Sequence, residues 1–180
     1  GFSIGANRTE ISPEISGTIQ KLLKNEGDHV RAGEVVAILK DPVIESQKNT
    51  AFQISQDSEN VRSDTKKLYD QKVDEAEAAL EKTEKSHDDG DASSEDVEMA
   101  EEAVKSAKRA RDLQIASSEM QVSGALGQFA SAESLAQKQN VRAPFSGTIT
   151  RRLSTEGSFV SPGTPLYSLS APGETEIKLN

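Results

Sequence analysis

Ser16-Gly17-Thr18-Ile19 and Ser146-Gly147-Thr148-Ile149 repeat the same four residues near the two ends of the 180-residue sequence. The similarity continues downstream without a gap, and both copies then read Glu-Gly, two residues, Val, two residues, Gly. The further aligned pairs are Glu26-Gly27 with Glu156-Gly157, Val30 with Val160, Gly33 with Gly163, and Leu39 with Leu169. An internal repeat of this kind indicates a structural unit that occurs twice.

Each copy alternates short β-rich runs with turn residues, which is typical of half-buried strands and hairpins. The candidate strands are residues 18–19, 35–39, 148–149 and 166–169. One copy is too small to cover its own hydrophobic face, so we expect residues 10–41 and 141–172 to pack together as one lipoyl-like β-sandwich. Two unrelated β-hairpins with similar turns are the alternative.

The sequence between the copies has a different composition. Residues 43–138 contain no proline and three glycines, and Ala, Glu, Lys, Gln and Ser dominate, all of them compatible with helix. Asp41-Pro42 offers an N-cap followed by proline at the first helical position. We therefore predict an α-helical hairpin over residues 42–140, with its tip near residues 86–93 and two helices of ~60–65 Å each.

Apolar residues at alternating three-four spacing predict that the two helices form an antiparallel coiled coil. The expected contact residues are Ala51, Ile54, Ser58, Val61, Thr65 and Leu68 on the first helix, and Val97, Ala100, Val104 and Ala107, then Leu113, Ala116, Met120 and Ser123, on the second. Ser93 with Asp96 resembles a capping box. Gly124 and Gly127 either allow close helix contact or mark a bend. The predicted fold class is α+β, a lipoyl-like β-sandwich split by a long antiparallel coiled-coil hairpin.

Composition and charge exclude several classes of function. The formal net charge of -9 is unsuited to nucleic acid and to anionic lipid. The absence of cysteine excludes disulfides, thiol catalysis and cysteine metal sites. No apolar run approaches the ~18 residues of a membrane-spanning helix. The start, Gly1-Phe2-Ser3-Ile4, has no features of a signal peptide.

The repeated Ser-Gly-Thr-Ile…Glu-Gly…Val…Gly pattern resembles the two half-motifs of lipoyl and biotinyl carrier domains. Residues 141–149, Val-Arg-Ala-Pro-Phe-Ser-Gly-Thr-Ile, resemble the second half-motif of the periplasmic adaptors, the membrane fusion (HlyD-like) family. In that family a helical hairpin separates the halves. The resemblance covers the chain from about Ile11 onward.

This resemblance implies a non-enzymatic adaptor in a tripartite efflux or secretion system. The expected partners are an outer-membrane channel of the TolC type and an inner-membrane transporter, either an ABC transporter or a proton-driven pump. It further implies a homo-oligomer, a hexamer, in the periplasm, anchored to the inner membrane by a segment absent from this chain. Residues 173–180 resemble the entry to the family's β-barrel domain, so we expect the chain to be a fragment.

Adaptors that contact such a channel often carry a tip motif of Arg, Leu and Ser. With Ser93 as the anchor, the corresponding positions are Lys82 and Ser86, so one of the three residues matches. We expect the channel-contact residues to be Lys82, Ser86, Gly90 and Ser93. The acidic residues around them, Glu81, Glu84, Asp88, Asp89 and Asp91, call for a basic or polar partner. Ser93 is alternatively an N-cap, and the two roles are compatible.

Three other classes of protein compete with the adaptor interpretation: a carrier, a metal-binding protein and an enzyme. A lipoyl- or biotinyl-type carrier with a coiled-coil insertion would need a modified lysine, and Lys40 lacks the flanking Asp or Met that modifying enzymes expect. His87 with Asp88, Asp89 and Asp91 could offer oxygen ligands to a hard cation, but the spacing is not that of a calcium loop. No catalytic triad, phosphate loop or carboxylate pair stands out, so neither a cofactor nor an enzymatic activity is predicted.

Overall fold

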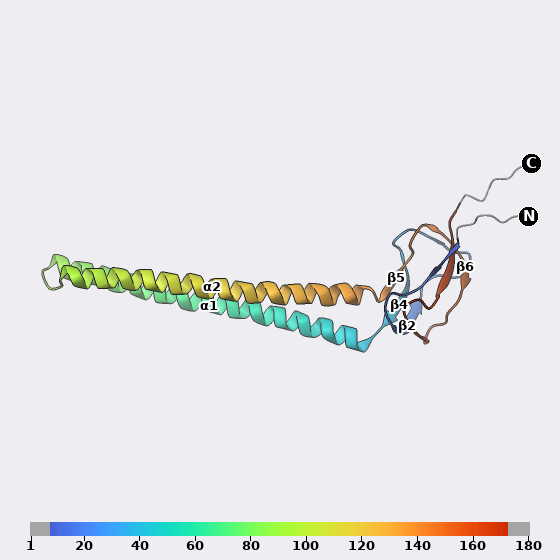
Figure 1. Ribbon diagram of the computed structural model, residues 1–180, viewed down its shortest axis with the longest axis horizontal. Coiled ribbons are helices and arrows are strands. Elements are labelled where there is room, and N and C mark those ends of the chain that lie inside the picture. The colour runs from blue at the N-terminus through green and yellow to red at the C-terminus, as the bar shows by residue number, and fades with distance from the viewer. Residues whose placement is uncertain (1–7, 173–180) are drawn as a thin grey trace, which may run out of the picture. The chain divides into compact units, whose positions relative to one another are not determined.

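The computed structural model describes residues 8–172, which form eight strands and two long helices (Figure 1). The expected α+β fold class, with two long helices forming a hairpin beside antiparallel sheets, is confirmed. The elements are β1 (Arg8–Ile11), β2 (Gly17–Leu22), β3 (His29–Val30), β4 (Val35–Lys40), α1 (Pro42–Asp88), α2 (Ser94–Gln137), β5 (Asn140–Arg142), β6 (Gly147–Arg152), β7 (Phe159–Val160) and β8 (Tyr167–Ser170).

The chain divides into two compact units, and the division falls within the helices. Asn49–Ala130 form the hairpin unit, and the chain before Asn49 and after Ala130 forms the β unit. The domain limits predicted from the sequence, 10–41 with 141–172 and 42–140, stay predictions. Residues 173–180, expected to begin a β-barrel, lie outside the described residues.

The β unit consists of two four-stranded antiparallel sheets in which the two sequence copies exchange strands. One sheet has the order β1-β8-β6-β3 and the other β5-β4-β2-β7. The short strand of each copy therefore pairs with the long strand of the other, β3 with β6 and β7 with β2. Neither sheet is complete without both copies.

Reciprocal hydrogen bonds join the two copies at equivalent positions. The amide of Gly27 donates to the carbonyl of Ile149, and the amide of Gly157 donates to that of Ile19, both at 2.8 Å. The amides of Ile149 and Ile19 in turn donate to the carbonyls of Asp28 and Ser158, each at 2.9 Å. The two Gly-Thr-Ile segments are thus partners in one folded unit.

The glycines of the repeat have two different physical roles. Gly27, Gly33, Gly157 and Gly163 all have positive φ angles, which glycine adopts without the strain that a side chain would cause. Gly147 instead has no room for a side chain, because a Cβ there would collide with the carbonyl oxygen of Ser170. A Cβ at the equivalent Gly17 would lie 3.2 Å from the carbonyl oxygen of Lys40.

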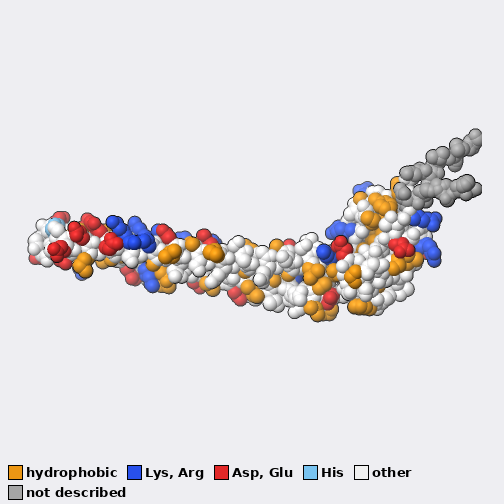
Figure 2. All heavy atoms as spheres, in the orientation of Figure 1, with side chains coloured by type: hydrophobic (Ala, Val, Ile, Leu, Met, Phe, Trp, Pro, Cys, Tyr) orange, Lys and Arg blue, Asp and Glu red, His pale blue; other side chains and the backbone are white. Residues whose placement is uncertain are grey.

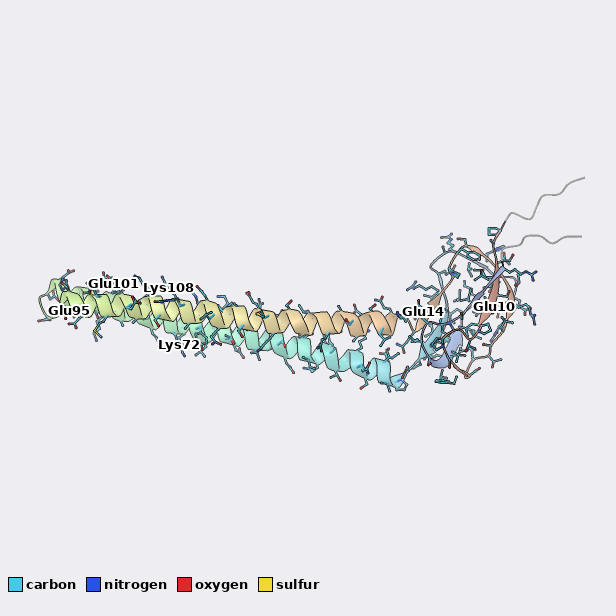
Figure 3. All side chains as sticks on the ribbon, viewed as in Figure 1. Glu10, Glu14, Lys72, Glu95, Glu101 and Lys108 are labelled. Atoms are coloured by element: carbon cyan, nitrogen blue, oxygen red, sulfur yellow. The ribbon has the colours of Figure 1, made fainter. Side chains whose placement is uncertain are left out.

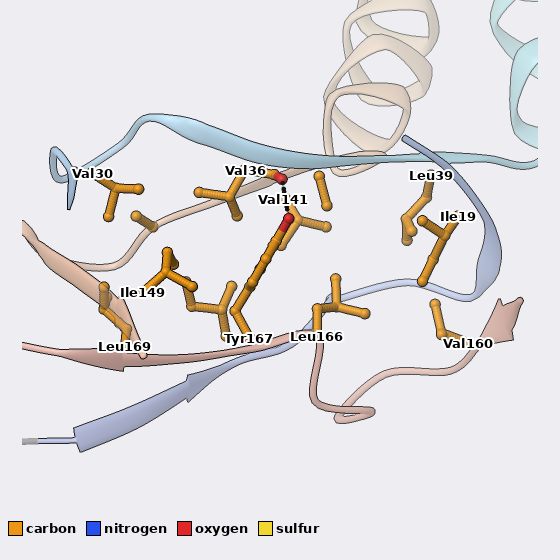
Figure 4. Packing of buried hydrophobic residues seen from close by; sticks show 13 residues of the cluster. Ile19, Val30, Val36, Leu39, Val141, Ile149, Val160, Leu166, Tyr167 and Leu169 are labelled. Carbon is orange, nitrogen blue, oxygen red and sulfur yellow. Dashed lines mark hydrogen bonds between the residues drawn. The ribbon is translucent and has the colours of Figure 1, made fainter. Parts of the chain in front are cut away.

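Tyr167 breaks the two-fold similarity of the core. It is fully buried among aliphatic side chains contributed by both copies, whereas the equivalent residue of the first copy is Ala37 (Figure 4). The Tyr167 hydroxyl accepts from the Lys24 amide at 3.1 Å and lies 3.0 and 3.2 Å from the carbonyls of Lys24 and Val36. One side chain of the second copy therefore satisfies backbone groups of the first.

Strands were predicted at β2, β4, β6 and β8, and all four are present. The sequence did not predict β1, β3, β5 and β7, which pair with β8, β6, β4 and β2 in that order. All four are short and lie at sheet edges, so their hydrophobic pattern is too brief to be recognised. β5 follows α2 directly and β4 precedes α1, so both ends of the hairpin continue into neighbouring strands.

The first turn of α1 has the predicted cap. The Asp41 carboxylate accepts from the Val43 amide at 2.9 Å, with Pro42 at the first helical position. The buried Gln139 then ties the two helix ends together within the β unit. Its Oε1 accepts from the Asp41 amide at 3.0 Å, and its Nε2 donates to Glu45 Oε1 at 2.7 Å.

The coiled-coil contact residues of α1 differ from the prediction at alternate positions. Ala51, Ser58 and Thr65 face α2 as expected, but Ile54, Val61 and Leu68 are 48, 52 and 49% exposed. Ser55, only 2% exposed, occupies the place predicted for Ile54. Its hydroxyl donates to the Phe52 carbonyl at 2.7 Å, so the buried polar group has a partner. The inward-facing stripe of α1 is Ala51, Ser55, Ser58, Thr65, Tyr69, Val73, Ala76 and Leu80.

On α2 the predicted coiled-coil contact residues are right near the turn and wrong farther from it. Val97, Ala100, Val104 and Ala107 face α1, but Leu113 and Met120 are 71 and 75% exposed, and Ala116 and Ser123 are exposed too. The inward stripe instead continues through Arg111, Ile115, Ser118, Val122, Ala125 and Phe129. Two consecutive steps of four residues in this stripe, on either side of Arg111, constitute a stutter.

The stutters of the two helices lie opposite each other. On α1 the inward stripe also takes two steps of four residues, around Tyr69. At this level Arg111 Nη1 lies 3.9 Å from Asp70 Oδ1, across the two helices. A stutter unwinds a coiled coil locally. Because the two stutters lie at the same height, the inward stripes of α1 and α2 face each other both before and after this point.

Replacing Tyr167 by Phe is expected to destabilise the β unit by about 1–3 kcal/mol, because buried backbone groups would lose their partner. Burial raises the pKa of the Tyr167 hydroxyl, against the opposing effect of the Lys24 backbone hydrogen bond. The associated stability is therefore complete below the unfolded-state pKa of about 10 and is lost as the pH rises through the folded-state value. Amide hydrogen exchange of the strands at increasing pH measures this effect. Tyr69→Phe, in the hairpin unit, is the matched control and should leave strand exchange unchanged.

Candidate functional site: the hairpin tip

The turn between α1 and α2 is fixed by a glycine-dependent helix end. Gly90 has a φ of 85°, and its amide donates to the His87 carbonyl at 3.0 Å. The Asp91 amide donates to the Ser86 carbonyl at 2.7 Å. These two bonds form a Schellman motif, which satisfies carbonyls that would otherwise lack partners at the end of α1.

The start of α2 is fixed by the capping box that the sequence predicts. Asp96 donates its amide to Ser93 Oγ at 3.1 Å, and Ser93 donates its amide to Asp96 Oδ2 at 3.0 Å. The Ser93 backbone amide, followed by its side chain, lowers the pKa of the Asp96 carboxyl. Ser93 therefore has a definite structural role whether or not it contacts a partner.

The four predicted contact residues divide into two pairs. Lys82 and Ser86, one turn apart on α1, line a shallow open depression together with Asp91, Asp96 and Met99, among others. Gly90 and Ser93 are exposed but do not line it. They hold the turn whose ends bound this depression.

Charge is strongly segregated along the hairpin. Residues 73–104, the acidic distal segment, contain thirteen Asp and Glu against two Lys. Residues 66–72 and 105–111, the basic band, contain seven Lys and Arg against one Asp. Red and blue side chains form adjoining clusters near the end of the hairpin in Figure 2. Figure 3 shows Glu95 and Glu101 nearer the turn than Lys108 on α2.

Ion pairs across the two helices contribute little at this site. Lys108 Nζ lies 3.8 Å from Glu77 Oε1, and both side chains are half exposed. Exposed pairs of this kind contribute about 0–1 kcal/mol. Most carboxylates of the acidic distal segment are exposed to solvent. The segment therefore presents a strong negative potential to any partner that approaches the tip.

The structure also locates the residues on which the carrier and metal-binding interpretations depend. Lys40 ends β4, and Asp41 then caps α1, so this lysine does not lie at the tip of a β-turn that joins the two halves. His87 Nδ1 is engaged with the Ala92 carbonyl at 2.9 Å. Among residues 8–172, no three His, Asp or Glu side chains gather as a metal ion would require. Within the same residues, no helix combines the length and apolar character needed to span a membrane.

Comparison with known proteins identifies the family. A family model described as "CzcB-like, barrel-sandwich hybrid domain" matches residues 7–171. The chain therefore belongs to the CzcB-like barrel-sandwich hybrid family, and the resemblance to membrane fusion proteins of efflux or secretion systems is confirmed. No curated protein sequence matches the chain.

Solved structures share its fold. MacA from Actinobacillus actinomycetemcomitans matches with a TM-score of 0.65 and 18% identity over 90% of this chain and 48% of MacA. The periplasmic adaptor protein EmrA matches with a TM-score of 0.52 and 15% identity, covering 92% of this chain and 72% of EmrA. The soluble domain of LipC, a membrane fusion protein of a type I secretion system, gives 0.52 and 12%, with coverage of 91% and 99%. At these identities the likeness concerns the fold, and the chain spans about half of the MacA structure.

Ser93→Ala is expected to fray the start of α2 at a cost of about 1 kcal/mol, because the amide of Asp96 loses its acceptor. Ser93→Asp, which retains a capping oxygen, is the control and should keep the helix start protected. The Asp96 contribution should be present above the ordinary carboxyl pKa of about 3.9 and disappear as the pH falls through its lowered folded-state value. Hydrogen exchange of the first amides of α2 between pH 6 and 2 follows both effects; equal exchange in Ser93→Ala and wild type would contradict the role of the cap.

Proposed function

We propose that the chain is the core of a periplasmic adaptor that links an inner-membrane transporter to an outer-membrane channel. The observation that carries the proposal is a hairpin inserted between two interlocked halves of one β unit, with a capped and strongly charged turn at its end. A turn fixed by both a Schellman motif and a capping box presents one defined surface, which suits recognition by a partner.

The tip is the proposed contact with the channel, which is of the TolC type in the resembling family. Lys82 and Ser86 lie together in the depression and are the proposed direct contacts. Gly90 and Ser93 maintain the turn, and Ser93 is exposed enough to contact a partner too. The negative potential of the acidic distal segment favours a channel end that carries basic or polar groups.

The proposed transporter partner and the proposed number of copies are taken from the resembling family. The β unit would serve the transporter, which is an ABC transporter or a proton-driven pump. Several copies, six in the resembling family, would surround one export path in the periplasm. A carrier function at Lys40 is not favoured, because this lysine adjoins the capped start of α1.

Lys82→Glu in the full-length protein is expected to reduce export severalfold, because it removes the ammonium donor of the proposed contact from the depression and places a carboxylate beside Asp91 and Asp96, which line the same depression. Export of the natural cargo in cells that carry the variant as the sole copy measures the effect. Lys105→Glu, an equal charge change at an exposed position of the basic band, is the matched control and should leave export unchanged. Equal export in wild type and Lys82→Glu would contradict the proposed tip contact.

Ser93→Asp separates the capping role of Ser93 from a contact role. Aspartate caps a helix as well as serine does, so helix protection should stay, while docking to the channel weakens because a contact at this position loses the hydroxyl donor. Binding of the purified full-length protein to the channel in detergent should also weaken as salt is raised. Binding that is altered neither by Ser93→Asp nor by raised salt would exclude an electrostatic contact at Ser93.

A further inference from the structure

The helix α2 carries two apolar stripes, and its contact with α1 covers one of them. The second, here named the outer stripe, follows unbroken four-three spacing through Met99, Ala103, Ser106, Ala110, Leu113, Ser117, Met120, Gly124 and Gly127. All nine residues are exposed. This spacing is that of a coiled-coil contact and suits packing against another helix.

The helix α1 carries a matching set of exposed side chains. Ile54, Asp57, Val61, Asp64 and Leu68 follow three-four spacing and are all exposed. The three apolar members are the residues that the sequence assigns to the contact with α2. They flank that contact instead, so their apolar surface remains uncovered.

The register of the hairpin places these two sets at the same height. The rings of Phe52 and Phe129 are 5.4 Å apart, and Asp70 contacts Arg111 farther along. Counting from these pairs, Leu68 is level with Leu113. By the same count Val61 is level with Met120, and Ile54 with Gly127.

We propose that the outer stripe of α2 packs against α1 of a second copy of this chain, with Leu68 facing Leu113, Val61 facing Met120, and Ile54 facing Gly127. The sizes are complementary, because the large Ile54 and Asp57 meet Gly127 and Gly124, where the backbone can approach closely. Both sets have the same alternation of steps, so one antiparallel register pairs each of the five α1 residues with a residue of the outer stripe between Leu113 and Gly127. This proposal rests on the proposed assembly of several copies and names the surfaces that form it.

Charge limits this contact to the part of the hairpin outside the acidic distal segment. Two copies at equal height would bring their acidic distal segments together, where like charges repel. The copies would therefore pack along residues 54–68 and 113–127 while their tips stay apart. Salt screens the repulsion and should strengthen this contact, the opposite of its effect on docking to a basic channel.

Disulfide trapping tests the register directly, because the chain contains no cysteine of its own. Leu68→Cys and Val61→Cys proteins are each mixed with tagged Leu113→Cys and Met120→Cys proteins and mildly oxidised. A disulfide needs Cα atoms within about 7 Å, whereas one heptad displaces them by about 10 Å. The pairs 68–113 and 61–120 should therefore cross-link about five times or more as efficiently as 68–120 and 61–113, and more so at high salt.

The controls separate the register from the assembly itself. Equal yields in all four mixtures, with association seen by sedimentation equilibrium, would overturn the register and leave the adaptor proposal standing. No association at millimolar concentration and no preference in trapping would overturn the copy-to-copy contact altogether. Met120→Glu should abolish association while leaving helical circular dichroism unchanged, because Met120 is 75% exposed in the single chain.

Discussion

The reciprocal backbone hydrogen bonds between the two sequence copies are the constraint on which the β unit depends. Gly27 and Gly157 each give their amide to an isoleucine carbonyl of the opposite copy. Because each copy supplies the short edge strand of the other's sheet, neither can satisfy its backbone alone. Folding must therefore bring together two segments that the whole hairpin separates in sequence.

This interlocking explains why a long insertion is tolerated. The chain leaves β4 into α1 and returns from α2 into β5, and these two strands are hydrogen-bonded neighbours. Loop-closure entropy rises slowly with length, and a hairpin that pairs with itself closes its own loop. Gln139 then fixes both helix ends with bonds to Asp41 and Glu45. The insertion is thus held by the sheet that it interrupts.

The parts that were predictable from sequence are those governed by local chemistry. Three features each depend on a few neighbouring residues, and all three are present: the positive φ of Gly27 and Gly157, the Asp41 cap, and the Ser93–Asp96 capping box. The hydrogen bonds of Tyr167 could not be inferred, because they join its hydroxyl to a strand of the other copy. At the tip, the residue pattern indicated a turn near 86–93, but it could not show that Lys82 and Ser86 share a depression with Met99.

The error in the coiled-coil contact has a physical cause. A rule that buries the largest apolar residues selects Ile54, Leu113 and Met120, yet these are exposed, and the buried residues of the hairpin include the small Ser55, Ser118 and Ala125 beside three valines. Periodicity identifies a stripe but not its partner, and α2 has two stripes with nearly the same period. Small residues such as Ala51, Ser55 and Ala125 occupy many of the positions between α1 and α2, while large side chains such as Leu113 and Met120 lie on the outside. A single chain therefore leaves a row of apolar side chains exposed at coiled-coil spacing, and the proposed second copy offers a helix that matches it.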